Sequence, residues 1–174
     1  KVRDGQRHAP RPAVPRQRAI DEAQLGHPDR TITFATEGSG VGLFDPDRMA
    51  QVVGNLLSNA IAYSPPASVV HIGTHEAGDA HVVIEVRNDG RAIAPGEIET
   101  LFDPFRRGAD TARTTQGLGL GLFIASQIVA AHGGRIWVES VEGAWTRFSV
   151  WLPLPNADSS TIMGRRADLK PGAQ

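Results

Sequence analysis

The chain has 174 residues, of which 40% are hydrophobic, so it is long enough for one domain with a real core and too short for two ordinary ones. Its net charge of −1 gives no electrostatic reason to bind nucleic acid or anionic lipid, and we expect no nucleic-acid partner and no direct membrane contact. The absence of cysteine excludes disulfides and thiolate metal sites and agrees with a reducing, cytoplasmic compartment.

The beginning of the chain predicts a linker followed by the first elements of a domain. Residues 1–18 are rich in Arg and Pro, and the first residue is not Met, so we expect a fragment joined to an absent upstream domain. A short helix is expected at about 15–25, ended by Gly26 and Pro28. The alternation of apolar residues and threonines in 31–36 predicts a half-buried strand.

The strongest helical signal starts at Asp45, a good N-cap, with Pro46 suited to the first helical position. The helix should end near Tyr63, because Pro65 and Pro66 cannot continue it. Its apolar residues recur at helical spacing: Met49, Val52, Val53, Leu56, Leu57 and Ala60.

The rest of the chain alternates between short strands and helices. The expected strands are 70–75, 81–87, 136–138 and 148–152, the expected helices are about 95–101 and 118–132, and a hairpin loop joins 75 to 81. This order predicts an α+β fold, a two-layer α/β sandwich whose mixed, mainly antiparallel sheet of about five strands is covered on one face by about three helices. We assign 19–154 to this domain and expect a disordered tail at 155–174.

Three polar or glycine-marked segments are candidates for binding. Asn55, Asn59 and Tyr63 lie at i, i+4 and i+8, a row along the edge of the apolar helix face. Asparagine is a poor residue for the middle of a helix, and its amide oxygen is a suitable ligand for Mg²⁺. The alternative is that each amide bonds to nearby backbone, which we would prefer for a single asparagine.

The second segment is 88–93, directly after a strand, where Gly90 permits a turn and a close approach of backbone to a ligand. An ordinary turn explains it equally well when taken alone. The third is 117–122, where alternating glycines expose backbone N–H groups at a helix N-terminus, an arrangement suited to phosphates. The polar stretch 106–116 before it is a candidate lid. Its arginines, Arg106, Arg107 and Arg113, are either close to phosphates or simply solvated.

The order of these segments resembles the ATP-binding catalytic domain of sensor histidine kinases, over roughly residues 45–154. The matching segments are 55–60 (N box), 86–90 with Ile93 (G1 box), 101–106 (F box), 117–122 with Ile124 (G2 box) and the C-terminal pattern 132–136, 139–140 and 148–153. The family's fold is an α/β sandwich shared with gyrase, a class of heat-shock chaperones and mismatch-repair ATPases.

The resemblance implies a role for each segment. Asn59 would ligate Mg²⁺, Asn55 would lie beside the phosphates of ATP, and both would be catalytic. Tyr63 would lie near the nucleotide, Asn88 would read the adenine amino group and Gly90 would approach the base. The remaining nucleotide contacts implied are Ile93, Phe105, Gly117, Leu118, Gly119, Leu120, Gly121, Leu122 and Thr146. Phe102 and Phe105 would also anchor the lid.

Three residues depart from the family's pattern. Asn88 replaces the usual aspartate, so its hydrogen bond to the base lacks charge and should be weaker. Ala92 replaces a glycine, which narrows the backbone conformations allowed there. Trp145 also replaces a glycine, which puts the local strand geometry in doubt.

The implied chemistry is phosphoryl transfer from Mg-ATP to a histidine on an upstream helical dimerisation domain, and then to a response regulator receiver domain. None of the six histidines here resembles that acceptor. His71, His75 and His81 form a metal site only if they cluster across two strands, and we favour solvent-facing histidines. The alternatives to the kinase are a degenerate nucleotide-binding or scaffold module and an anti-sigma-type serine kinase of the same superfamily.

Overall fold

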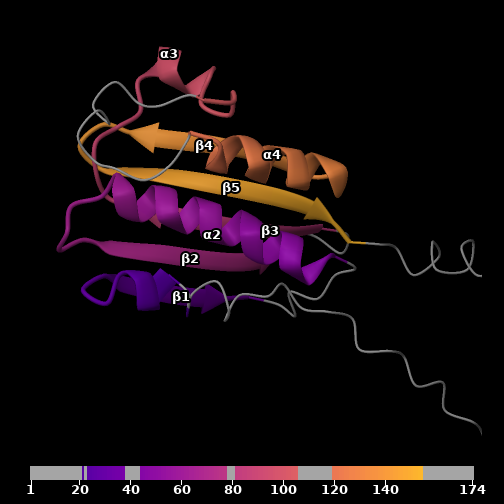
Figure 1. The fold of residues 1–174 in the computed structure, drawn as a ribbon, viewed down its shortest axis with the longest axis horizontal. Coiled ribbons are helices and arrows are strands. Elements are labelled where there is room, and N and C mark those ends of the chain that lie inside the picture. Colours follow the sequence, from indigo (N-terminus) through magenta and orange to yellow (C-terminus); the bar gives the residue numbers. More distant parts are fainter. Residues whose placement is uncertain (1–20, 22, 38–43, 78–80, 106–118, 155–174) are drawn as a thin grey trace, which may run out of the picture.

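The computed structural model of the protein describes residues 21, 23–37, 44–77, 81–105 and 119–154. The predicted linker, the predicted lid and the predicted tail lie outside these residues. Within them, five strands form a single sheet (Figure 1). The strands are β1 (Thr31–Thr36), β2 (Val69–Glu76), β3 (His81–Asn88), β4 (Arg135–Val141) and β5 (Trp145–Pro153).

The sheet has the strand order β1-β2-β3-β5-β4. β1 pairs with β2 in parallel, and every other neighbouring pair is antiparallel. The predicted mixed, mainly antiparallel sheet is therefore confirmed. Its last strand along the chain, β5, lies inside the sheet between β3 and β4.

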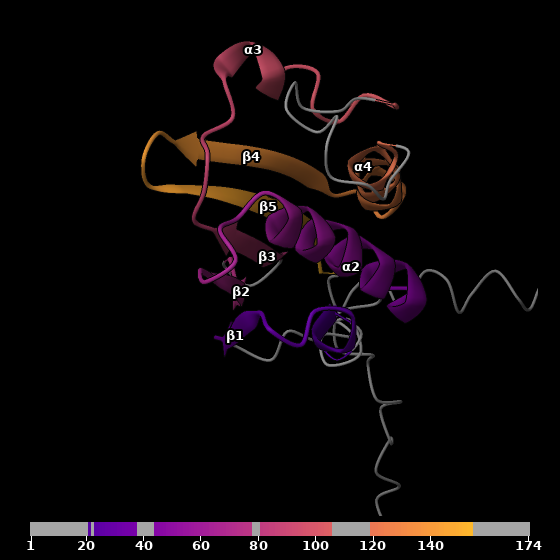
Figure 2. The ribbon, with the colours of Figure 1, turned by 60° about the vertical axis from the view of Figure 1, so that its left-hand side comes forward.

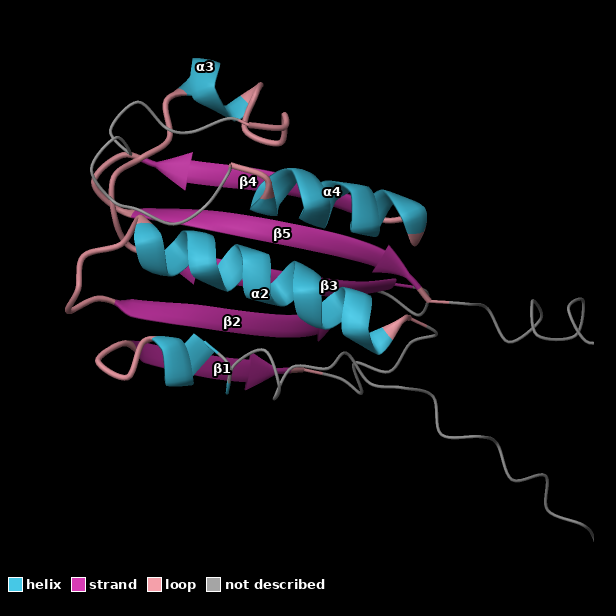
Figure 3. Ribbon diagram, in the orientation of Figure 1, coloured by secondary structure: helices cyan, strands magenta, loops and turns pink. Residues whose placement is uncertain are grey.

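Two long helices, α2 (Pro46–Ala62) and α4 (Gly121–Ala131), lie side by side on one face of this sheet and make the second layer (Figure 2). The much shorter α3 (Pro95–Ile98) lies outside this layer, beyond β4 (Figures 2 and 3). A further helical turn at 23–26 precedes β1. No helix in the described ranges is long and apolar enough to cross a membrane.

α2 begins and ends where its sequence predicts. The Asp45 carboxylate accepts hydrogen bonds from the backbone N–H groups of Asp47 (3.0 Å) and Arg48 (3.1 Å), two donors that the first turn leaves free. Pro46 occupies the first turn, and Tyr63 is the C-cap. Seven side chains form the buried face of α2: Met49, Val52, Val53, Leu56, Leu57, Ala60 and Ile61.

The core lies between α2, α4 and the sheet. On β3, alternate residues Val82, Ile84 and Val86 point into it, as the period of a strand requires. Phe148 of β5 is 1% exposed and meets the ring of Phe102 edge-on at 6.5 Å. Phe102 therefore packs against the core, which is compatible with its expected role as an anchor of the lid.

Two predicted helices are shorter than expected. α3 ends at Ile98, and the chain continues to Asp103 through turns whose N–H groups bond three residues back. Pro104 disfavours helical geometry at Asp103, which explains why the helix does not resume. α4 begins at Gly121, because Gly119 takes a left-handed φ of 69° that a helix cannot accommodate.

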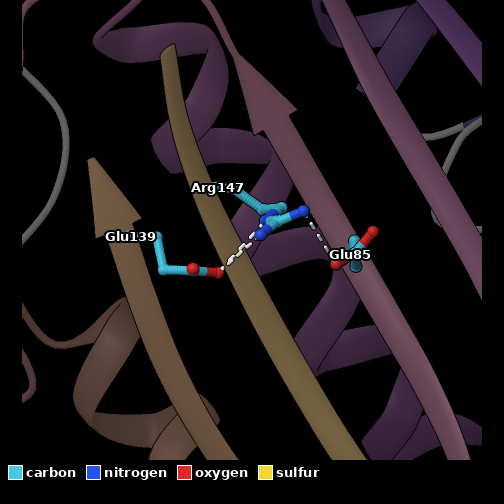
Figure 4. A network of polar contacts seen from close by, with 3 residues as sticks. All are labelled: Glu85, Glu139 and Arg147. Carbon is cyan, nitrogen blue, oxygen red and sulfur yellow. Dashed lines mark hydrogen bonds and ion pairs between the residues drawn. The ribbon is translucent and has the colours of Figure 1, made fainter. Parts of the chain in front are cut away.

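The sheet face opposite the helices carries an ion-pair network (Figure 4). Arg147 of β5 lies between Glu139 of β4, at 2.8 Å, and Glu85 of β3, at 3.5 Å. The Trp145 ring lies 5.1 Å from the Arg147 guanidinium and 5.4 Å from that of Arg87. Trp145 pairs in register with Val141 and starts a regular nine-residue strand, so the aromatic residue does not disturb the strand geometry.

Candidate functional site

The asparagine row of α2 runs along the side of the helix. Asn55 and Asn59 are half-buried, and Tyr63, at the C-cap, is 43% exposed. The polar row therefore stays partly accessible while the neighbouring leucines, Leu56 and Leu57, are fully buried. Two other segments of the chain approach the two ends of this row.

At the first end, Asn55 lies against the start of α4. A β-carbon built on Gly121 would lie 3.5 Å from the Asn55 side-chain oxygen. The Asn55 Nδ2 atom is buried and has no hydrogen-bond partner among the described residues. The alternative that nearby backbone satisfies this amide is thus wrong for the Asn55 donor. A buried donor without a partner suits an acceptor supplied by a ligand.

The N-terminus of α4 offers further donors. Its N-cap, Leu120, makes no side-chain hydrogen bond to the first turn, so no side chain of the cap satisfies the first backbone N–H groups. Such a terminus attracts anions through its free amides and the helix dipole. The Leu122 side chain belongs to the core, which leaves only its backbone for a ligand. Gly117 and Leu118 lie outside the described residues.

At the other end of the row, Tyr63 meets Gly90. The Tyr63 carbonyl oxygen lies so close to Gly90 that a β-carbon there would collide with it. Asn88 lies beside the same glycine and is 2% exposed, and its Nδ2 donates a hydrogen bond to the Asp89 carbonyl oxygen at 3.1 Å. The turn after β3 is therefore held against the end of α2 by backbone contact.

Asn88 continues a polar row across three strands, on the face that carries the helices. Thr146 of β5 pairs with Asn88 of β3 and with Ser140 of β4. The Ser140 hydroxyl bonds to the Thr146 hydroxyl at 2.7 Å and accepts a hydrogen bond from the Ile93 N–H at 3.0 Å. The sequence placed Ser140 in the family's C-terminal pattern but did not predict these bonds, because nothing local marks a serine as the bridge between a strand and a distant loop.

Two further residues singled out from the sequence, Phe105 and Ala92, matter here through their backbone. The Phe105 ring is 71% exposed, and its backbone N–H bonds to the Gly119 carbonyl at 3.1 Å, so the backbone and not the ring ties 105 to 119. Phe105 has a φ of 63°, whereas Ala92 keeps a negative φ, so the missing glycine at 92 causes no strain.

The three strand histidines do not meet at a metal site. His71 bonds to the Thr33 hydroxyl at 2.7 Å, and His81 stacks on Trp151 with ring centroids 4.2 Å apart. The part of the chain that the structure describes contains no group of three or more histidine, aspartate or glutamate side chains able to hold a metal ion. Any metal at the α2 row would need amide and phosphate oxygens as ligands.

Comparison with known proteins identifies the family of this domain. The family described as "Histidine kinase-, DNA gyrase B-, and HSP90-like ATPase" matches residues 44–156. The chain is 35% identical over 143 residues to a bacteriophytochrome of Pseudomonas aeruginosa, covering 82% of this chain and 19% of the relative. It is 40% identical over 111 residues to the sensor histidine kinase ZraS of Salmonella typhimurium, covering 63% of this chain and 23% of the relative. The chain thus spans about a fifth of the length of these relatives.

Solved structures show the same fold. The mycobacterial sensor histidine kinase MprB superposes with a TM-score of 0.70 at 26% identity, covering 79% of this chain and 91% of that one. The catalytic domain of the histidine kinase ThkA superposes with a TM-score of 0.66 at 28% identity, covering 80% and 92%. The residues that match the family, 44–156, include the whole of α2 with its asparagine row. The chain belongs to the histidine kinase-, gyrase- and HSP90-like ATPases and is a catalytic ATP-binding domain of the sensor histidine kinase type.

Proposed function

We propose that this domain holds Mg-ATP along the α2 row and presents its γ-phosphoryl group to a histidine on a separate helical dimerisation domain. A response regulator receiver domain would then take the phosphoryl group. Because ATP is the donor, this chemistry belongs to the cytoplasm, whether or not the parent protein is anchored in a membrane. The contacts at the two ends of the row support this arrangement.

The phosphates would lie between Asn55 and the start of α4. The unpartnered Asn55 Nδ2 supplies one donor, and the amides of Gly121 and Leu122 supply others. These groups are already oriented by two packed helices, so little reorganisation is needed as charge develops on the transferred group. Glycines at 117 and 119 would allow the backbone to approach the phosphate oxygens.

Mg²⁺ fits the donor set of the same row. The Asn59 amide oxygen is the hard, uncharged ligand that this ion accepts beside water and phosphate oxygens. When bound, Mg²⁺ would supply positive charge that offsets the negative charge of the phosphates during the transfer. Asn59 would hold the ion one helical turn from Asn55, which contacts the phosphates.

The adenine base would lie at the other end, near Tyr63 and Gly90. The Asn88 Nδ2 donates to the Asp89 carbonyl, so the Oδ1 atom remains as the acceptor for an exocyclic amino group. Thr146, paired with Asn88 and bonded to Ser140, would add a hydroxyl beside it. Ile93 and Phe105 would supply apolar surface next to the nucleotide.

The observation that carries the proposal is the buried, unpartnered donor of Asn55, a residue whose side chain lies against the uncapped start of α4. It is tested by mixing the chain with the helical domain of its parent protein and [γ-³²P]ATP. Acid-labile, base-stable phosphate on a histidine of that domain is the expected product. Acid-stable phosphoserine on a protein partner would instead favour a serine kinase of the same superfamily.

A degenerate nucleotide-binding module is the second candidate, because Asn88 gives the base an uncharged acceptor. Titration calorimetry with Mg-ATP and Mg-ADP separates the two. We expect measurable heat with both nucleotides, whereas a chain that gives no heat up to millimolar nucleotide would be a scaffold and not a kinase.

A further inference from the structure

Arg30 connects the segment just before β1 to the C-terminal end of α2. It lies in the turn between the helical residues 23–26 and β1. Its guanidinium donates hydrogen bonds to the Pro65 carbonyl at 2.6 Å, to the Ile61 carbonyl at 3.4 Å and to the Ser64 hydroxyl. These acceptors are 31 to 35 residues away along the chain.

The guanidinium supplies a charge that α2 lacks. No basic residue occurs in the last turn of the helix, although the carbonyls there carry the negative end of the helix dipole. Arg30 brings a cation to that end from another part of the fold. Its Nη atoms bind a carbonyl of the helix and a carbonyl of the following loop together, so the position of one is tied to that of the other.

The residues that Arg30 binds surround Tyr63 on both sides. Ile61 precedes Tyr63 by two residues, and Ser64 and Pro65 follow it directly. The Tyr63 carbonyl is the group that leaves no room for a side chain at Gly90, and the Tyr63 N–H bonds to the Asn59 carbonyl at 3.1 Å. A shift of the loop at 64–65 would therefore move the contact between α2 and the Asn88–Gly90 turn.

We propose that Arg30 is a positioning residue of the nucleotide site, which acts through the Tyr63 carbonyl to set the distance between α2 and the Asn88–Gly90 turn. The inference rests on the proposed function, because it assumes that the nucleotide lies between these two segments. The three hydrogen bonds of the Arg30 guanidinium go to residues on either side of Tyr63, so its effect on the site would be indirect. Arg30 would also link the segment before β1 to the end of α2, where the adenine base is proposed to bind.

Lysine cannot replace this arginine. A single ammonium group on a flexible stem reaches one acceptor at a time, whereas the planar guanidinium holds several donors in a fixed fork. Arg30→Lys keeps the charge at the end of α2 and removes the fork. Ser64→Ala is a second, milder variant, because it leaves both backbone acceptors of the guanidinium and removes the Ser64 hydroxyl, which also donates to the Ile61 carbonyl at 3.4 Å.

The experiment uses the chain's single tyrosine, which is Tyr63. Replacement of tyrosine by 3-fluorotyrosine gives one ¹⁹F resonance that reports directly on this position. Titration calorimetry with Mg-ATP and urea unfolding complete the measurement. Arg48→Lys is the matched control, because Arg48 lies at the other end of α2 and its guanidinium bonds only to Gln51 of the same helix in the described contacts.

We expect Arg30→Lys to weaken Mg-ATP binding about fivefold and to shift the ¹⁹F resonance of the free domain, while Arg48→Lys changes neither. Ser64→Ala should act in the same direction to a smaller extent. In the double variant the loss of affinity should be smaller than the sum of the two single losses, because both changes disturb the same cluster of contacts. If Arg30→Lys does not fold, Ser64→Ala decides the question with the same two readouts.

A lower unfolding midpoint with unchanged nucleotide affinity and unchanged ¹⁹F resonance would make Arg30 a purely structural residue and overturn the inference. Failure of the proposed function has a different signature. A wild-type chain that does not bind Mg-ATP removes both proposals, whereas Mg-ATP binding that depends on Asn59 but not on Arg30 removes only this one.

Discussion

The carbonyl oxygen of Tyr63 lies against the α-carbon of Gly90 and leaves no space for any side chain there. This contact joins the last turn of α2 to the turn after β3, two segments whose approach depends on a residue without a β-carbon. Gly90→Ala should therefore push the segments apart and lower the free energy of unfolding by about 1–3 kcal/mol, as overpacking does elsewhere. Nucleotide affinity should fall as well, which calorimetry at a temperature well below unfolding would measure.

A matched control for that variant is Gly96→Ala, because a β-carbon at Gly96 meets no atom within 4 Å. Gly96 lies in the short α3, outside the helix layer. We expect nucleotide affinity to be unchanged in this variant. An equal loss in both variants would mean that the contact with Tyr63 has no special role.

Gly54→Ala should stabilise the domain. Gly54 lies in the middle of α2, where a β-carbon would again find open space, and alanine is favoured over glycine in a helix by about 1 kcal/mol. The urea midpoint should rise without a change in the slope of the transition. A lower midpoint would show that the side of α2 at Gly54 is packed against something in solution.

Asn59→Ala should weaken nucleotide binding only when Mg²⁺ is present. The residue is half-buried on the helix row, so its removal should change the unfolding midpoint little. Calorimetry with ATP in Mg²⁺ and in EDTA separates the two contributions, and Ser58→Ala, on the exposed side of the same turn, is the control. Equal affinities for Asn59→Ala and wild type in Mg²⁺ would exclude Asn59 as a metal ligand.

Asn88→Asp should leave adenine binding as strong as in the wild type or strengthen it. The free domain should be less stable by about 1–3 kcal/mol, because the substitution buries a carboxylate and removes the donor to the Asp89 carbonyl. If affinity is as high or higher, nucleotide should stabilise this variant at least as much as it stabilises the wild type. A clear loss of affinity would mean that the base is read by another group.

Arg147→Ala should lower stability by about 1 kcal/mol and leave nucleotide binding unchanged. The side chain bridges Glu85 and Glu139 on the sheet face that the helices do not cover, and it also packs on Trp145. Because the ion pairs are partly exposed, the difference from wild type should shrink at 1 M salt. A difference that does not depend on salt would assign the effect to packing on the tryptophan.

The local sequence was sufficient to predict a helix or strand wherever the residues that begin and end it lie within the same short segment. Asp45 and Pro46 set the beginning of α2, and the prolines after Ser64 set its end. The alternation in 31–36 predicted the bounds of β1 to the residue, but the expected half-burial was wrong for Phe34, which is 42% exposed. The asparagine row and its glycine-marked partners were predicted for the same reason, since residue type and helical spacing are properties of short stretches.

Tertiary structure alone decided which of these segments meet. Nothing in the sequence near Arg30 indicates that it reaches Ser64, nor does anything near Ser140 predict its bond to Ile93. The place of β5 between β3 and β4 likewise follows from packing over the whole sheet. Contacts between residues distant in the chain leave no periodic pattern, because their free energy depends on how complete elements fit together and not on any local stretch.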